Sequence, residues 1–294
     1  MSDQTFRQLA RPPSAAVFMP RAVWPRPALA ALPARGLRLG PARLDGPALQ
    51  RYLQLTGQAA SDTLPLAWPQ VAGFRLQMAL LTERAFPLPI WSALQVRNHL
   101  LRHEALPLDA RYVVAVRPAA RRRLGKGCEV DLHCTVQRAD RLVWESLTTF
   151  YWRRRGSEPA DALSPLAASP AVEAPVLARW DAGQGSGWRF GALTGDYNGL
   201  HWSDAYARAF GFARAFHHPP RMLGQCLARL GLPAAPARQR LDVWIKGPVF
   251  YRSPVALRAA DDSSCRTFAL HVGDDSRPAL VGRWAPADDA TALA

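Results

Sequence analysis

Apolar and polar residues alternate with a period of two in three consecutive segments of the first half of the chain. Their alternation and their content of β-branched residues predict the strands of an antiparallel meander. Four segments of the second half show the same kind of pattern. The predicted strands are Arg111–Arg117, Cys128–Gln137 and Leu142–Trp152 in the first half, and Leu241–Lys246, Val255–Ala259, Thr267–Val272 and Ala279–Trp284 in the second.

One apolar segment favours a helix instead. Between Phe86 and Leu101, the spacing of Ile90, Leu94 and Leu101 suits a helical face, and the proline pair near its beginning suits a first helical turn. We therefore expect a helix over 86–101, followed by the first three strands.

Composition divides the chain into five parts. Residues 1–38 are rich in proline and arginine and predict an extended arm packed on the surface. Residues 39–156 form a first α+β unit, and residues 157–179, rich in Ala, Pro and Ser, form a linker. Residues 180–286 form a second unit with the same order of loop, helix and strands, and 287–294 form a tail.

Two short matches between the units favour a duplicated fold. The first aligns Tyr52–Gln58 with Phe190–Asp196, with the aromatic, Leu, Thr and Gly positions in register. The second has a different offset and aligns Phe86, Pro89 and Gln95 with Phe216, Pro219 and Gln225.

Overall composition excludes several classes of protein. The chain has 294 residues, 49% of them hydrophobic and 20% charged, which is typical of a globular protein. No uncharged apolar run is long enough for a membrane-spanning helix, so we expect no membrane partner. The net charge of +14 comes almost entirely from arginine, without a nucleic-acid-binding motif, so we expect no nucleic acid partner. The four cysteines form no C-x-x-C pair, and we expect reduced thiols in a cytoplasmic protein.

The most informative residues for chemistry are Asp196, Asn198 and His201. Gly195 and Gly199 allow the backbone to bend sharply around them, so that the carboxylate and the imidazole could converge on one point. Such a pair is suited to general acid–base catalysis. The residues by themselves leave open an Asx turn with a purely structural histidine.

This segment resembles the signature of the MaoC-like family, which contains (R)-specific enoyl-CoA hydratases and related dehydratases. The matching positions are Phe190, Leu193, Thr194, Gly195, Asp196, Asn198, Leu200, His201 and Ala207. The similarity is strong over most of 186–285, including Lys246–Phe250, and weaker over about 39–155, where Trp68-Pro69 and 86–89 match two-domain members. The resemblance implies an α+β double hotdog, in which each half is a long central helix wrapped by a curved antiparallel sheet.

The resemblance also implies catalytic roles. Asp196 and His201 would activate a water that adds to C3 of a trans-2-enoyl thioester, giving an (R)-3-hydroxyacyl thioester, and Asn198 would orient the pair. A backbone N–H at the start of the central helix would hold the thioester oxygen. The family has His-Gly there, whereas this chain has a proline pair without N–H groups. The expected helix-start residues are therefore Arg221, Met222 and His218, and the expected substrate pocket consists of Tyr197, Gly199, Trp202 and Leu223.

Within the repeat, Gln58 aligns with Asp196 and Thr63 aligns with His201. Neither an amide nor a hydroxyl can serve as the base, so we expect the first half to be catalytically silent. We expect no metal and no separate cofactor, because coenzyme A or a carrier protein would be part of the acyl thioester substrate. Another hotdog chain, identical or different, is an expected partner, and fatty acid metabolism the expected context. Two alternatives stay open: a hotdog acyl thioesterase, and a non-catalytic protein for acyl-thioester binding or assembly.

Overall fold

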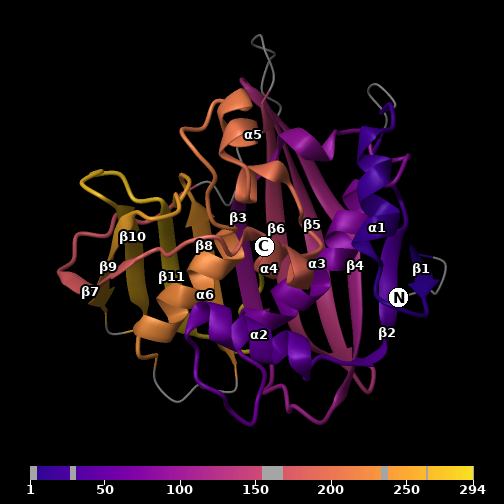
Figure 1. Ribbon diagram of the computed structural model, residues 1–294. Helices are drawn as coiled ribbons and strands as arrows, with labels where there is room; N and C mark the ends of the chain where they lie inside the picture. The colour runs from indigo at the N-terminus through magenta and orange to yellow at the C-terminus, as the bar shows by residue number, and fades with distance from the viewer. Residues whose placement is uncertain (1–4, 27–30, 154–167, 233–237, 263, 294) are drawn as a thin grey trace.

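The computed structural model describes residues 5–26, 31–153, 168–232, 238–262 and 264–293 (Figure 1). We call residues up to 153 the N-terminal half and residues from 168 the C-terminal half. The elements of the N-terminal half are β1 (Phe6–Leu9), α1 (Ala15–Phe18), η2 (Met19–Val23), β2 (Gly36–Arg43), α2 (Pro47–Thr56), α3 (Trp68–Leu81), η3 (Ile90–Ser92), β3 (Ala93–Arg102), β4 (Arg111–Leu124), β5 (Gly127–Arg138) and β6 (Arg141–Arg153). Those of the C-terminal half are β7 (Val176–Asp181), α4 (Gly187–Thr194), η4 (Gly199–His201), α5 (Asp204–Ala209), α6 (Pro219–Arg229), β8 (Gln239–Ile245), β9 (Pro254–Asp261), β10 (Arg266–Val272) and β11 (Leu280–Pro286).

All the strands form one sheet, and its order repeats. The order is β1-β2-β4-β5-β6-β3-β8-β11-β10-β9-β7. Read outward from the centre, β3-β6-β5-β4-β2 corresponds strand for strand to β8-β11-β10-β9-β7. The two halves are joined by antiparallel pairing of β3 with β8, with Arg97 opposite Trp244 and Arg102 opposite Gln239. The sheet order therefore confirms the predicted duplication.

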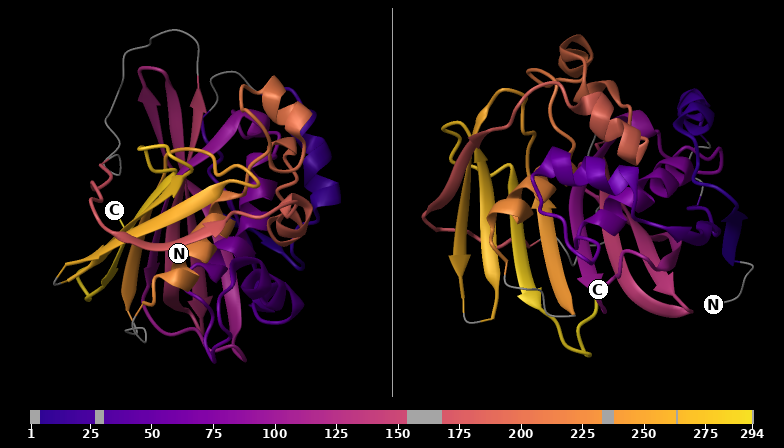
Figure 2. Two further views of the ribbon diagram at one scale, coloured as in Figure 1. Left: turned by 60° about the vertical axis from the view of Figure 1, so that its left-hand side comes forward. Right: turned by 60° about the horizontal axis from the view of Figure 1, so that its bottom comes forward.

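The helices lie on one face of the sheet, which curves around them (Figures 1 and 2). In each half a central helix, α3 or α6, begins with proline in its first turn. Helix α3 is buried on nearly every side, from Trp68 to Leu81. A central helix wrapped by a curved antiparallel sheet is the hotdog arrangement, so the molecule is an α+β double hotdog. Among the described residues, no helix is long and apolar enough to cross a membrane.

All seven strands predicted from alternation are present, but the helix predicted over 86–101 is wrong. That segment forms the short helix η3 and then β3. Every residue of β3 from Arg97 to Arg102 is buried, because the C-terminal tail covers its other face: Leu293 packs against Leu101. A strand buried on both faces has no polar alternation, and its apolar residues then resemble a helical pattern.

The first of the two repeat matches is structurally equivalent, and the second is not. Helices α2 and α4 both end at a Thr-Gly pair whose glycine, Gly57 or Gly195, adopts the left-handed conformation that closes a helix. In contrast, Gln95 lies in a strand and Gln225 lies in helix α6. The second match is therefore coincidental, and α3 is the real counterpart of α6.

The N-terminal arm is not a simple extended peptide. Residues 6–9 form β1, which pairs in parallel with β2, so the boundary expected at residue 38 falls inside β2. The side chain of Phe18 is only 1% exposed and belongs to the main core. An apolar anchor of this kind fixes the arm by burial.

The linker and the tail also pack on the sheet. Residues 157–167 of the predicted linker lie outside the described residues, and 168–175 contain no helix or strand. Val172 packs against Trp244, Ala269 and Val281 on the sheet. Strand β7 begins at residue 176, inside the predicted linker, because its pairing with β9 is a tertiary contact that composition does not reveal.

Candidate active site

The loop after α4 brings the predicted acidic residue into the site. Gly195 reverses the chain, and the backbone N–H of Asn198 donates a hydrogen bond to the Asp196 carboxylate at 3.1 Å. The side-chain oxygen of Asn198 accepts a hydrogen bond from the N–H of Leu200 at 3.2 Å and so caps η4, the turn that ends at His201. Asn198 thus holds Asp196 in place through its backbone N–H and holds His201 in place by capping η4.

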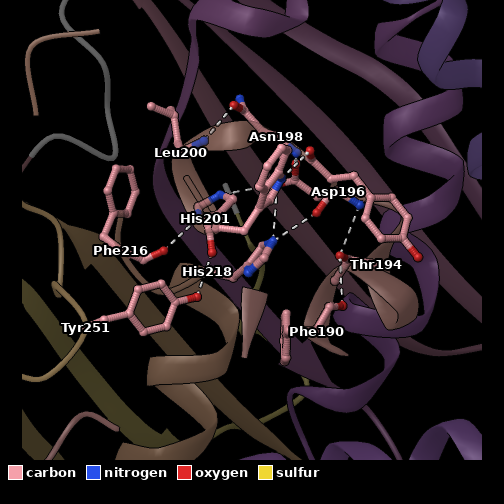
Figure 3. Close-up of polar contacts among 11 residues, drawn as sticks. Phe190, Thr194, Asp196, Asn198, Leu200, His201, Phe216, His218 and Tyr251 are labelled. Atoms are coloured by element: carbon pink, nitrogen blue, oxygen red, sulfur yellow. Dashed lines mark hydrogen bonds and ion pairs between the residues drawn. The ribbon is translucent and has the colours of Figure 1, made fainter. Parts of the chain in front are cut away.

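The imidazole of His201 faces the carboxylate of Asp196 (Figure 3). The Nδ1–H of His201 donates to the carbonyl oxygen of Phe216 at 3.0 Å, which fixes the tautomer and leaves the lone pair on Nε2. That Nε2 lies 3.6 Å from Oδ2 of Asp196. The Tyr251 hydroxyl donates to the His201 carbonyl oxygen at 2.7 Å and fixes its backbone as well.

A second histidine completes the cluster. The ring of His218 stacks on that of His201, with centroids 3.7 Å apart and planes inclined by 25°. Its Nε2–H donates to the backbone oxygen of Asp196 at 3.0 Å. Burial, together with the charge of His201, lowers the pKa of His218 to about 3. His218 is therefore neutral near pH 7, and it clamps the Asp196 loop to the start of α6.

The charge state of Asp196 follows from its surroundings. Burial by itself raises the pKa of this carboxyl, but the hydrogen bond and charge that the protonated form of the His201 ring offers outweigh burial and lower the pKa to about 2. Asp196 is consequently a carboxylate at neutral pH and can accept a proton.

The cluster fits a water molecule better than a metal ion. Asp196, His201 and His218 each offer one potential ligand atom, all within 4.8 Å of one another. However, the Nε2 of His218 carries the proton that it donates to the Asp196 carbonyl, so it has no lone pair for a metal. Two ligands are fewer than a structural or catalytic metal site normally has.

Asp196 and His201 line a cavity of about 260 Å³ between the two halves. The N-terminal half contributes an almost entirely apolar wall, made of Phe74, Met78, Ile90, Ala93, Leu94, Gln95, Val96 and Phe150. The C-terminal half contributes the polar side chains Asp196, Asn198, His201, His217 and Lys246, together with further apolar residues. Such an apolar cavity with a few converging polar groups is typical of a small-molecule site.

The residues predicted for the substrate pocket do not line this cavity. Trp202 is 45% exposed, and both it and Tyr197 stack against Trp188 on the outside of the loop. Gly199 packs against the ring of Tyr206, and Leu223 is buried in the main core. Proximity in sequence to the motif was misleading here, because the apolar wall comes from the other half of the chain.

Two of the three residues predicted to donate at the helix start, Arg221 and Met222, have backbone N–H groups that are already hydrogen-bonded. The N–H groups of Arg221 and Met222 both donate to the carbonyl oxygen of His218, at 3.0 and 3.3 Å. Pro219 and Pro220 have no N–H. Residues 219–222 therefore offer no free backbone donor.

His217 has a structural position. Its Nδ1 accepts a hydrogen bond from the guanidinium of Arg221, and its ring contacts Tyr251. Burial, and then the charge of Arg221, lowers the pKa of His217 to about 2. Arg221 also donates to the carbonyl oxygen of Leu55, linking the start of α6 to the N-terminal half.

The fold and the site together define a class. A duplicated hotdog sheet and an Asp/His cluster beside an apolar cavity are the features expected of two-domain MaoC-like dehydratases, and the comparisons confirm this resemblance.

The chain is similar to 3-hydroxyacyl-thioester dehydratase X of Mycobacterium tuberculosis. The two sequences are 26% identical over 232 residues, which cover 78% of this chain and 81% of the relative. A crystal structure of that protein, HtdX, superposes with a TM-score of 0.74 and 22% identity, covering 86% of this chain and all of the other. A MaoC-like dehydratase from Phytophthora capsici gives a TM-score of 0.66 and 16% identity over 83% and 92% of the two chains. A double-hotdog protein of M. tuberculosis gives 0.51 and 14% identity over 81% and 85%. No protein-family model matches the chain.

Proposed function

We propose that this protein is a hydratase/dehydratase that interconverts trans-2-enoyl and (R)-3-hydroxyacyl thioesters. The observation that carries the proposal is the Asp196 carboxylate lying 3.6 Å from the free Nε2 of His201, beside an apolar cavity. The similarity to a 3-hydroxyacyl-thioester dehydratase supports the same class of reaction.

The two side chains can carry out the acid–base chemistry that this reaction needs. In hydration, the Asp196 carboxylate and the Nε2 of His201 accept hydrogen bonds from one water molecule. As the water oxygen bonds to C3 of the enoyl thioester, one of the two accepts a proton, and the electron pair of the double bond moves toward the thioester oxygen. The proton then returns to C2 as the enolate collapses, so the addition consumes one water and leaves the enzyme unchanged.

The cavity supplies the complementary binding surface. Its apolar wall from the N-terminal half suits the acyl chain, because burying methylene groups there is favourable by about 0.8 kcal/mol each. The acid–base pair comes from the C-terminal half, so a bound acyl thioester would contact both halves. Fatty acid metabolism, a cytoplasmic location and pairing with another hotdog chain stay predictions from the sequence.

Direct hydration assays test the proposal. The full chain is incubated with crotonyl-CoA, with longer trans-2-enoyl-CoAs and with the same acyl groups on a carrier protein, and loss of the conjugated double bond is followed by absorbance. We expect hydration to a 3-hydroxyacyl product of R configuration, and loss of that activity in His201→Ala. No hydration at high enzyme concentration would refute the proposal. Release of free thiol without hydration would instead identify a thioesterase.

A further inference from the structure

The addition of water to an enoyl thioester needs a hydrogen-bond donor for the carbonyl oxygen. Negative charge accumulates on that oxygen as the enolate forms, and a preorganised donor stabilises it. The first turn of α6 does not provide one, since Pro219 and Pro220 lack N–H groups and the next two N–H groups are bonded to His218. Residues 219–222 therefore provide no donor, and the other residues on the cavity wall are the candidates.

Gln95 has the required chemistry. It is the one polar side chain among the described residues that the N-terminal half places on the cavity. Its amide nitrogen is buried and has no hydrogen-bond partner in the described part of the chain. A buried amide without a partner is costly, and such groups in a native protein call for a functional explanation.

The sheet positions Gln95 at the junction of the two halves. Strand β3 pairs with β6 through Gln95, but its pairing with β8 begins only at Arg97, and the register of β3 against β6 shifts between these two residues. Bulges of this kind redirect side chains and are common next to active sites. Residues 93–96 of β3 and residues 245–249, which begin at the last residue of β8, all line the cavity. The same 245–249 segment holds the start of α6, through a hydrogen bond from His217 N–H to the carbonyl oxygen of Val249.

We propose that the side-chain amide of Gln95 donates a hydrogen bond to the thioester carbonyl oxygen of the substrate and stabilises the enolate in place of the absent N–H at position 219. This inference rests on the proposed function and deepens it. It also gives the N-terminal half a group that touches the reacting part of the substrate, beyond its apolar wall.

If the Gln95 amide donates only to the substrate, removing it should lower activity without lowering stability. Gln95→Met keeps the length of the side chain and removes the amide, so the free protein loses an unsatisfied buried group while the transition state loses a donor. We expect kcat to fall by about 10²–10³-fold, the usual effect of removing one such donor, with little change in KM. The melting temperature should stay the same or rise.

The matched control is Gln58→Met. Gln58 is also partly buried, but its amide donates to the Tyr52 hydroxyl and to the Gly224 carbonyl oxygen, and it does not line the cavity. We expect this variant to lower the melting temperature and leave kcat within about threefold, far less than the loss of one catalytic donor. If Gln95→Met instead lowered the melting temperature and left kcat within about threefold, Gln95 would be structural and the proposal would be overturned.

A spectroscopic test separates this inference from the proposed reaction. The carbonyl stretch of ¹³C-labelled 2,4-hexadienoyl-CoA is measured by infrared difference spectroscopy, bound to Asp196→Asn and to Asp196→Asn/Gln95→Met. A hydrogen bond from Gln95 predicts a band shifted to lower frequency in the first protein and a loss of that shift in the second. An unchanged band would refute the role of Gln95 even if the wild type hydrates enoyl thioesters. A Gln95-dependent shift in a protein that hydrates nothing would leave the inference standing and refute the proposed function.

Discussion

The two halves of the molecule have the same strand order, yet among the described residues only the C-terminal half places an Asp/His pair on the cavity. Both have a helix that ends at a left-handed glycine, then a loop, an isolated β-bridge and a central helix. In the N-terminal half the loop between glycine and bridge is only 58–62, whereas in the C-terminal half it is 196–215 and contains η4 and α5. The additional chain in the second loop carries Asn198 and His201. The difference teaches that the length of one connection determines which half can hold an acid–base pair.

The alignment of Gln58 with Asp196 is structurally sound, because both directly follow the left-handed glycine. The alignment of Thr63 with His201 is wrong. Thr63 forms the β-bridge to Pro107, so its counterpart is Phe216, which forms the bridge to Phe250. The short loop of the N-terminal half has no position for a histidine equivalent to His201.

The largest effect on activity should distinguish Asp196 from Gln58, the two residues that follow the left-handed glycines. Asp196→Asn removes the carboxylate that accepts a proton, and we expect at least a 10³-fold loss of kcat/KM for enoyl thioester hydration. Gln58→Asp should not create a second site, because no histidine lies beside it. Steady-state assays of both variants check this, and a comparable loss in the two would contradict the assignment of chemistry to the C-terminal half.

The buried histidines should make the C-terminal half sensitive to acid. The pKa values of His217 and His218, about 2 and 3, lie far below the unfolded value near 6.5. At pH values between the folded and the unfolded pKa, these histidines bind more protons in the unfolded chain than in the folded protein. The free energy of unfolding therefore decreases as pH falls below about 6.5. Two such groups lower the free energy of unfolding by about 3 kcal/mol between pH 7.5 and 5.5. Urea unfolding at the two pH values measures the effect, and His218→Gln should remove about half of it. A pH effect unchanged in this variant would show that folding does not lower the pKa of His218.

The packing of α2 against α6, which joins the two halves, should be weakened by one added methyl group. A Cβ added at Gly224 of α6 would lie 2.4 Å from Cγ2 of Thr56 and 2.9 Å from the Tyr52 hydroxyl of α2. We expect Gly224→Ala to destabilise the protein by about 1–3 kcal/mol through overpacking. Gly125→Ala is the control, because a Cβ there meets no atom within 4 Å. Equal free energies of unfolding for the two variants would indicate that α2 and α6 separate easily.

The smallest effect should appear in chain-length preference. Met78 of α3 is buried and lines the cavity from the N-terminal half. Met78→Trp should reduce the cavity and lower kcat/KM for long enoyl thioesters by about tenfold or more, with crotonyl-CoA less affected, because each excluded methylene loses about 0.8 kcal/mol. Met78→Leu conserves volume and is the control. A uniform loss across chain lengths would mean that the acyl group does not reach this wall.

Much of the fold was predictable from local pattern. Strands with one apolar face, such as β5 and β10, alternate clearly and were found at nearly their true bounds. Strand β3 was missed because its partners β6 and β8 and the tail residue Leu293 cover it on all sides. Nothing in its own residues records those neighbours.

The same division applies to the site. The sequence by itself determined the strands that alternate, the turn at Gly195 and the proximity of Asp196 to His201, since all of these depend on residues close together in the chain. Only the tertiary structure decided the stacking of His218, the loss of donors at the start of α6 and the placement of Gln95 and Met78 on the cavity. These features join segments distant in sequence, and their geometry follows from how one continuous sheet and two central helices pack, which no local pattern encodes.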